Sequence, residues 1–187
     1  MSKLWTVNIQ INTIYFNRKS SWEKPFRNDR EWQENINMTA ASNSPDDQII
    51  SGNIGDFNLV VSPGDTIQWL ISEVNPIHSN KTNVCMYGLI AGKHWKNNLS
   101  DITTLHKDLI FPSIEHYFNS PENPDASFIS LDNVNTSIPF TQVITDKFIE
   151  KVSYHINIAL INTNDIIKPE IFDYIQLDSS LLITPSL

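Results

Sequence analysis

The chain has 187 residues, and its 13 Lys and Arg against 21 Asp and Glu give a net charge of −8. Phosphate contacts need clustered cationic side chains, so this balance argues against nucleic-acid binding. The single cysteine excludes an intramolecular disulfide. No apolar run reaches the roughly 18–20 residues of a membrane helix, and the opening residues lack a signal-peptide pattern. We therefore expect a cytoplasmic protein without membrane contact.

The first segment predicts a strand. Four apolar residues alternate with polar ones there, namely Trp5, Val7, Ile9 and Ile11, and a period of two is typical of a half-buried strand. The polar residues 17–48 lack such a period. Because a polar stretch of this length in a compact domain is often functional, we predict a long loop or a partner-contact insertion.

The middle of the chain predicts several further elements. Two alternating runs, residues 57–61 and 67–71, flank the sequence Ser62-Pro63-Gly64-Asp65. Proline and glycine suit the two central positions of a turn, so the runs form a hairpin or a corner between two sheets. The apolar run 84–90 predicts a central strand. Residues 100–109 have the cap signals of a short helix.

The C-terminal half predicts more strands between loops. One strand is expected near residues 128–131, a strongly alternating one at 152–160, and two more at 172–177 and 181–183. With 26 Ile and 8 Val against 13 Leu and 5 Ala, the composition also favours strands.

These elements together predict an all-β fold. We expect one domain spanning residues 1–187, an antiparallel β-sandwich with short helices in long loops. Immunoglobulin-like and jelly-roll topologies both fit the pattern.

Short motifs spread over nearly the whole chain form a recognisable set. They are Ser51-Gly52 before a strand, the turn Pro63-Gly64-Asp65-Thr66, the strand ending in Tyr87-Gly88, the run Tyr154-His155-Ile156-Asn157-Ile158, and the closing segment from Asp173 to Ile183. This set resembles the PixA/AidA family of bacterial inclusion body proteins. The closing segment departs from the family pattern, with Asp173, Leu177 and Ser179 in place of Gly, Trp and Pro.

The resemblance implies a function without catalysis. It implies a cytoplasmic bacterial protein, under stationary-phase or quorum-type control, that forms homodimers or higher oligomers and in some cases crystalline inclusions. It implies no catalytic residue and no cofactor.

The residues themselves give no convincing metal or catalytic motif. A blue-copper site needs two His, one Cys and usually a Met. His78, Cys85, Met86 and His94 supply these types, but the spacing from Cys85 to His94 is too long. We predict Cys85 to be a buried apolar residue. The five histidines lack zinc spacing, and no Gly-x-Ser-x-Gly elbow occurs.

Three tryptophans are the candidate contact residues. Trp22, Trp32 and Trp95 lie in polar stretches, whereas Trp5 and Trp69 belong to strand patterns and are expected in the core. Exposed aromatic rings anchor protein interfaces, so we predict that the first three contact another copy of the chain, with simple local packing as an alternative.

The alternative is a lectin-like carbohydrate-binding β-sandwich. Exposed tryptophan rings also stack on sugars, and the same three residues are its candidate ligand contacts. Loop carboxylates at Asp46, Asp47, Glu122 and Asp125 are expected in solvated turns, with a loop Ca²⁺ site as the alternative.

Overall fold

The computed structural model describes residues 2–18, 33–74, 82–114, 129–145, 150–164 and 167–184. They form two compact units, which are described separately. The main unit comprises residues 1–103 and 139–187, and the hairpin unit comprises residues 104–138. No helix in the described ranges is long and apolar enough to cross a membrane.

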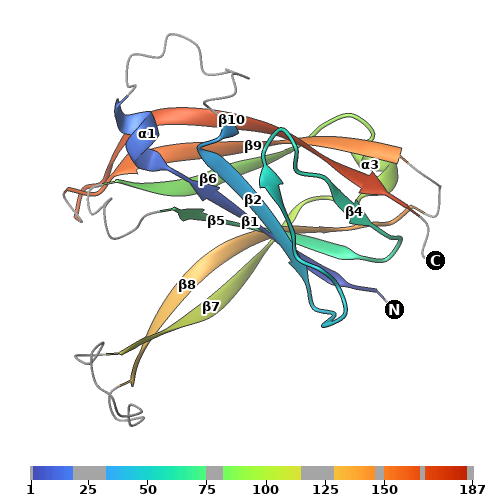
Figure 1. The fold of residues 1–187 in the computed structure, drawn as a ribbon, viewed down its shortest axis with the longest axis horizontal. Coiled ribbons are helices and arrows are strands. Elements are labelled where there is room, and N and C mark those ends of the chain that lie inside the picture. The colour runs from blue at the N-terminus through green and yellow to red at the C-terminus, as the bar shows by residue number, and fades with distance from the viewer. Residues whose placement is uncertain are drawn as a thin grey trace. The chain divides into compact units, whose positions relative to one another are not determined.

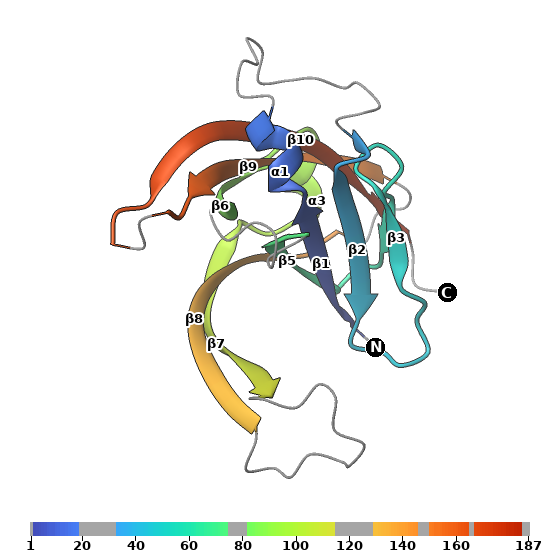
Figure 2. The same cartoon turned by 60° about the vertical axis from the view of Figure 1, so that its left-hand side comes forward.

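The first sheet has six strands in the order β3-β2-β1-β5-β8-β7 (Figure 1). Their bounds are β1 Leu4–Ile11, β2 Ile36–Ser42, β3 Ile50–Asn53, β5 Thr66–Glu73, β7 Thr103–Ile114 and β8 Ile129–Gln142. Figure 2 shows β1, β2 and β3 side by side. The pairing of β8 with β5 is confined to the end of β8 that belongs to the main unit, where Phe140 opposes Gln68 and Gln142 opposes Thr66.

The second sheet has four strands in the order β4-β10-β9-β6. Their bounds are β4 Leu59–Val61, β6 Thr82–Ala91, β9 Glu150–Asn162 and β10 Glu170–Ile183. The described residues also include two short helices, α1, Thr13–Arg18, and α3, Trp95–Asn98.

One apolar core holds the two sheets of the main unit together. Because side chains alternate along a strand, each sheet turns one apolar row inward. Val7, Ile9 and Trp69 from the first sheet share a cluster with Ile156 and Leu177 from the second, all without exposed surface. The prediction of an all-β, two-layered fold is confirmed, and Trp5 and Trp69 are core residues as expected.

A turn at Ser62–Asp65 carries the chain from one sheet to the other. The Asp65 amide donates to the Ser62 carbonyl at 3.0 Å. Gly64 has a φ of 87°, which only glycine adopts readily, as a type II turn requires. Because β4 and β5 lie in different sheets, the turn is a corner between sheets, one of the two alternatives expected.

The strand pairing is mixed, whereas the sequence predicted antiparallel pairing throughout. β1 pairs with β5 in parallel, and β4 pairs with β10 in parallel. The remaining pairings with a printed register, such as β9 with β10, are antiparallel. The parallel pairs join strands that are distant in the sequence, where no turn fixes their direction.

Three local predictions are wrong. The expected loop at 17–48 contains β2, in which Ile36, Met38 and Ala40 alternate as buried residues. The expected helix at 100–109 does not form, and residues 103–109 are the beginning of β7. The expected central strand at 84–90 is β6, which ends its sheet within the described residues.

Candidate functional site

The outer face of the second sheet is the face that points away from the core. Its side chains are aromatic at one end and polar in the middle. At one end, the register aligns Cys85, Ala159 and Tyr174 across β6, β9 and β10. Tyr87, at a bulge in β6, packs edge-on against Tyr174 with ring centroids 5.7 Å apart. Both rings stay largely open to solvent, at 56% and 51% exposure. This end of the face is an exposed aromatic patch.

The middle of the same face is polar. Gln176 donates to the Asn157 side-chain oxygen at 2.8 Å, and Asn157 lies so close over Gly88 that an added Cβ would approach its amide nitrogen to 3.2 Å. In the next row, His155 Nδ1 lies 2.6 Å from Asp178 Oδ1. Because side chains alternate along β9, His155 points to the opposite face from the buried Tyr154.

Strand β6 forms one edge of this sheet. Within the described residues it pairs only with β9. Its ten residues, TNVCMYGLIA, include no charged residue and no proline. Cys85 is exposed on this strand, so the prediction that it is buried is wrong. The edge position explains the difference, because outward-facing residues of an edge strand lack a neighbour on one side.

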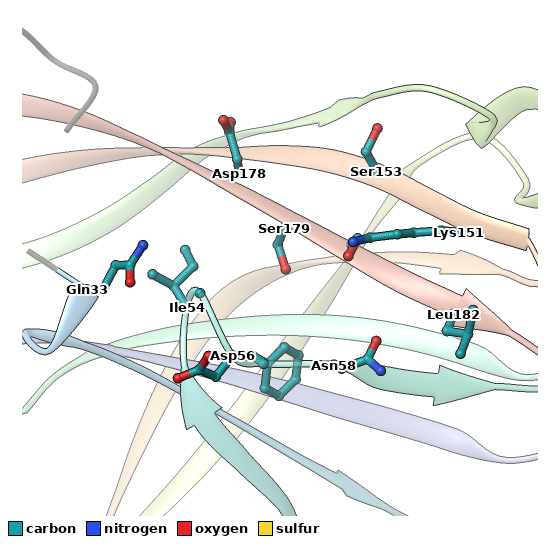
Figure 3. A pocket seen from close by; sticks show the side chains of 12 residues that line it. Gln33, Ile54, Asp56, Asn58, Lys151, Ser153, Asp178, Ser179 and Leu182 are labelled. Carbon is teal, nitrogen blue, oxygen red and sulfur yellow. The ribbon is translucent and has the colours of Figure 1, made fainter. Parts of the chain in front are cut away.

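A pocket of about 690 Å³ lies at the other edge of the second sheet, where β4 pairs with β10 (Figure 3). It is lined by Gln33, the loop residues Ile54, Gly55, Asp56, Phe57 and Asn58, and the sheet residues Lys151, Ser153, Asp178, Ser179, Ser180 and Leu182. β4 has only three residues and pairs with β10 from Leu181 to Ile183. The loop before β4 therefore departs from β10 near Ser180, and the pocket opens in the gap.

Two opposite charges line the pocket without a partner. Among the described residues, neither Asp56 nor Lys151 forms an ion pair. Asp178 is held by His155, and Ser153 Oγ accepts a hydrogen bond from the Lys93 amide at 2.8 Å. The pocket therefore offers a free carboxylate, a free ammonium and several hydroxyl and amide groups.

Behind the pocket wall lies a small set of buried polar atoms. Ser179 Oγ, Tyr154 OH and Trp69 Nε1 are all buried, and none makes a contact with hydrogen-bond geometry. Burial raises the pKa of the Tyr154 phenol above 10, while the nearby Ser179 hydroxyl and Trp69 indole oppose that increase. These three groups are close together but poorly satisfied, a costly arrangement in a core.

Trp95 is buried, so the expectation of an exposed contact ring is wrong for this residue, and the alternative of local packing describes it. It is 2% exposed and packs against Trp69 and Tyr154 with ring centroids 6.3 and 6.2 Å away. Its indole nitrogen donates to the Ser100 carbonyl at 3.0 Å. The polar neighbours of Trp95 lie on a helix of only four residues, which turns this one ring inward. Trp22 and Trp32 lie outside the described residues.

The described ranges contain no group of three or more His, Cys, Asp and Glu able to hold a metal ion. His94 Nδ1 pairs instead with Glu150 Oε1 at 2.7 Å. His78 lies outside the described residues.

The loop carboxylates of the calcium alternative are only partly described. Asp47 accepts from Lys3 Nζ at 2.7 Å and from the Ser42 hydroxyl, and both hydrogen bonds hold the pKa of Asp47 below its ordinary value. Asp46 is exposed in the same turn. Glu122 and Asp125 lie outside the described residues.

Comparison with known proteins decides the fold. No family model matches the sequence, and no curated protein matches it. The crystal structure of the inclusion body protein PixA from Burkholderia cenocepacia is similar, with a TM-score of 0.62 over 99% of this chain and 97% of that chain. This chain has the PixA fold. The resemblance found in the sequence motifs is confirmed for the fold. At 12% identity, the comparison supports the arrangement of the two sheets and carries no information about the surface residues.

Proposed function

We propose that the chain is a non-enzymatic, self-associating cytoplasmic protein of the bacterial inclusion-body type. The observation that carries the proposal is the PixA fold over nearly the whole length of both chains, joined to an exposed aromatic patch at Tyr87 and Tyr174. Exposed apolar patches on soluble proteins commonly mark interaction sites. Control by stationary phase or quorum sensing stays a prediction from the family resemblance.

The described side chains support a role without catalysis. Within the described residues, a serine–histidine contact joins Ser137 Oγ to His106 Nδ1 at 3.0 Å in the hairpin unit. Both side chains are exposed on adjacent strands, and no carboxylate within the described residues orients His106. A nucleophile and base need such an orienting group and a site that excludes water. The pair is therefore an ordinary cross-strand hydrogen bond.

Net charge sets the conditions under which copies associate. A charge of −8 makes copies repel one another at neutral pH. Protonation of carboxylates toward the pI near 4.9 removes that repulsion, and salt screens it. Self-association should therefore strengthen as pH falls and as ionic strength rises.

Sedimentation velocity tests this proposal. We expect larger species to grow as pH falls from about 8 to about 5, and at about pH 8 as salt rises from about 20 mM to about 500 mM. Return to the starting pH should restore the small species, and an unchanged circular-dichroism spectrum would separate assembly from acid unfolding. A monomer under every condition, with no inclusions in overexpressing cells, would contradict the proposal.

Carbohydrate binding is a second candidate function, and the pocket favours it. Sugar hydroxyls both donate and accept hydrogen bonds, and the pocket offers acceptors on Asp56 and donors on Lys151 and Asn58. Its volume of about 690 Å³ falls in the range of small-molecule sites. The buried Trp95 cannot stack on a sugar, so this site differs from the one that the tryptophans predicted.

A glycan array followed by titration calorimetry tests the second candidate. For any sugar that binds, Asp56→Asn and Lys151→Met should each weaken binding by about tenfold or more, because each removes a charged hydrogen-bonding group. Asp46→Asn, at an exposed turn outside the pocket lining, is the matched control and should bind as the unaltered protein does. Equal binding by all four proteins would place the sugar elsewhere, and an empty array would remove the candidate.

A further inference from the structure

We propose that two copies of the chain pair edge to edge through β6, antiparallel about a two-fold axis, so that the second sheet continues across the dimer. The inference rests on the proposed self-association and names its surface. Its occupant is a second copy of this chain, presenting the same strand. The view in Figure 1 places β6 beside β9, and β6 ends the sheet on that side within the described residues.

The first argument is that β6 lacks the usual protection of an edge strand. Natural sheets blunt their edges with charged residues, prolines or very short strands, because unpaired backbone groups recruit other strands. β6 is ten residues long and contains neither a charge nor a proline. Of the features that protect edge strands, β6 has only the bulge between Met86 and Gly88. An edge of this kind can pair over most of its length.

The second argument is electrostatic. The chain carries a charge of −8, so two copies repel each other least where their facing surfaces are neutral. Antiparallel self-pairing sets neutral β6 against neutral β6. At the other edge of the sheet, beside β4, the pocket lining includes the carboxylates of Asp56 and Asp178 and the ammonium of Lys151, so a second copy would have to bury charged groups there.

The third argument concerns the side chains beside the proposed β6–β6 pairing. A pair of strands alone buries less than the roughly 1,200–2,000 Å² of a stable interface. Tyr87 and Ile90, exposed at 56% and 43%, and the exposed Cys85 supply further apolar surface on β6. Two-fold symmetry presents each of them twice, because an isologous interface uses the same patch on both copies.

Cys85 provides a direct measurement, because it is the chain's single cysteine and is exposed on β6. One spin label can therefore be attached to each copy without other changes. If the strands overlap with Met86 and Tyr87 near the axis, strand geometry puts the two labels within about 20 Å of each other. Pulsed electron–electron double resonance on the associated protein should give this short distance between the two labels. A population confined to more than about 40 Å would overturn the inference.

A matched pair of variants gives an independent readout. Ile90→Lys places a charge on β6, while Ile49→Lys places the same charge on an exposed residue before β3. Each reduces the net negative charge by one, which by itself favours association. We expect Ile90→Lys to weaken dimerisation by about tenfold or more, and Ile49→Lys to leave it unchanged or slightly stronger because of the lower net charge. Equal dimerisation of both variants would overturn the inference.

Hydrogen exchange identifies what covers the edge. The backbone amides of β6 that point away from β9 should be protected from exchange at concentrations where the protein is associated. On dilution they should exchange fast. Protection that persists in the dilute monomer would mean that another part of the chain covers β6, and the inference would fail while the proposed function survived. An unaltered protein that never associates would instead remove the proposed function as well.

Discussion

Replacing Trp69 with alanine is expected to lower the free energy of unfolding by about 3–5 kcal/mol, the usual cost of emptying a buried aromatic site. Trp69 lies on β5 in the first sheet and is fully buried. It contacts Tyr154 of the second sheet at 5.5 Å and Trp95 of α3 at 6.3 Å between ring centroids. The cavity would therefore open where the two layers and the helix meet. Equilibrium urea unfolding, followed by circular dichroism, measures the change.

Two controls make this prediction specific. Tyr87→Ala removes an exposed aromatic ring and should change the free energy of unfolding by less than about 1 kcal/mol. Tyr154→Phe removes a buried hydroxyl without a hydrogen-bond partner, so it should be neutral or stabilising. A cost for Trp69→Ala close to that of Tyr87→Ala would contradict the packing described for this cluster.

Alkaline pH adds a second test of the cluster. Burial raises the pKa of Tyr154 in the folded chain above its unfolded value of 10. The unfolded chain therefore loses this proton first, and stability falls as pH rises from about 10 toward the folded pKa. Tyr154→Phe should remove this part of the alkaline loss. Equal loss in both proteins would show that the phenol of Tyr154 is not the group responsible.

Local pattern predicted those parts of the fold in which one face of a strand is buried. The alternation of Trp5, Val7, Ile9 and Ile11 predicted β1, and the turn residues Pro63 and Gly64 predicted a turn that left a hairpin and a corner between sheets both open. The pattern in β2 was equally regular, but its small Ala and polar Asn and Thr residues gave too weak an apolar signal. For β7, helix-cap residues competed with the strand pattern, and pairing with β8 decided the outcome.

The candidate sites depend on strand order, which the sequence does not give. Val84 to Ile90 forms a nearly continuous apolar run, typical of a central strand, yet β6 is an edge. An unprotected edge and a buried strand have the same composition, so composition could not separate them. The pocket likewise arises because β4 is much shorter than the β10 strand that it pairs with, and Asp56 and Lys151 are far apart in sequence. The pattern of charges gave no signal for either feature.

The carboxylate of Asp65 is the second group whose loss should be costly. It is 3% exposed and accepts from the Lys3 amide at 2.8 Å, the Ser62 amide at 2.9 Å and the Trp5 indole at 3.2 Å. These donors belong to the start of β1 and to the corner between β4 and β5. One side chain therefore holds the N-terminal strand against the turn through which the chain changes sheets.

Asp65→Ala is expected to lower the free energy of unfolding by about 3 kcal/mol, because it leaves three donors without a partner and each unmet buried group costs about 1–3 kcal/mol. Urea unfolding measures this change. Asp65→Asn keeps the shape and one acceptor oxygen, so its cost should be smaller, and Asp56→Asn in the loop before β4 is the surface control. A loss below about 1 kcal/mol for Asp65→Ala would mean that water replaces the carboxylate. The corner would then be held by Gly64 and the packing of β4 and β5 alone.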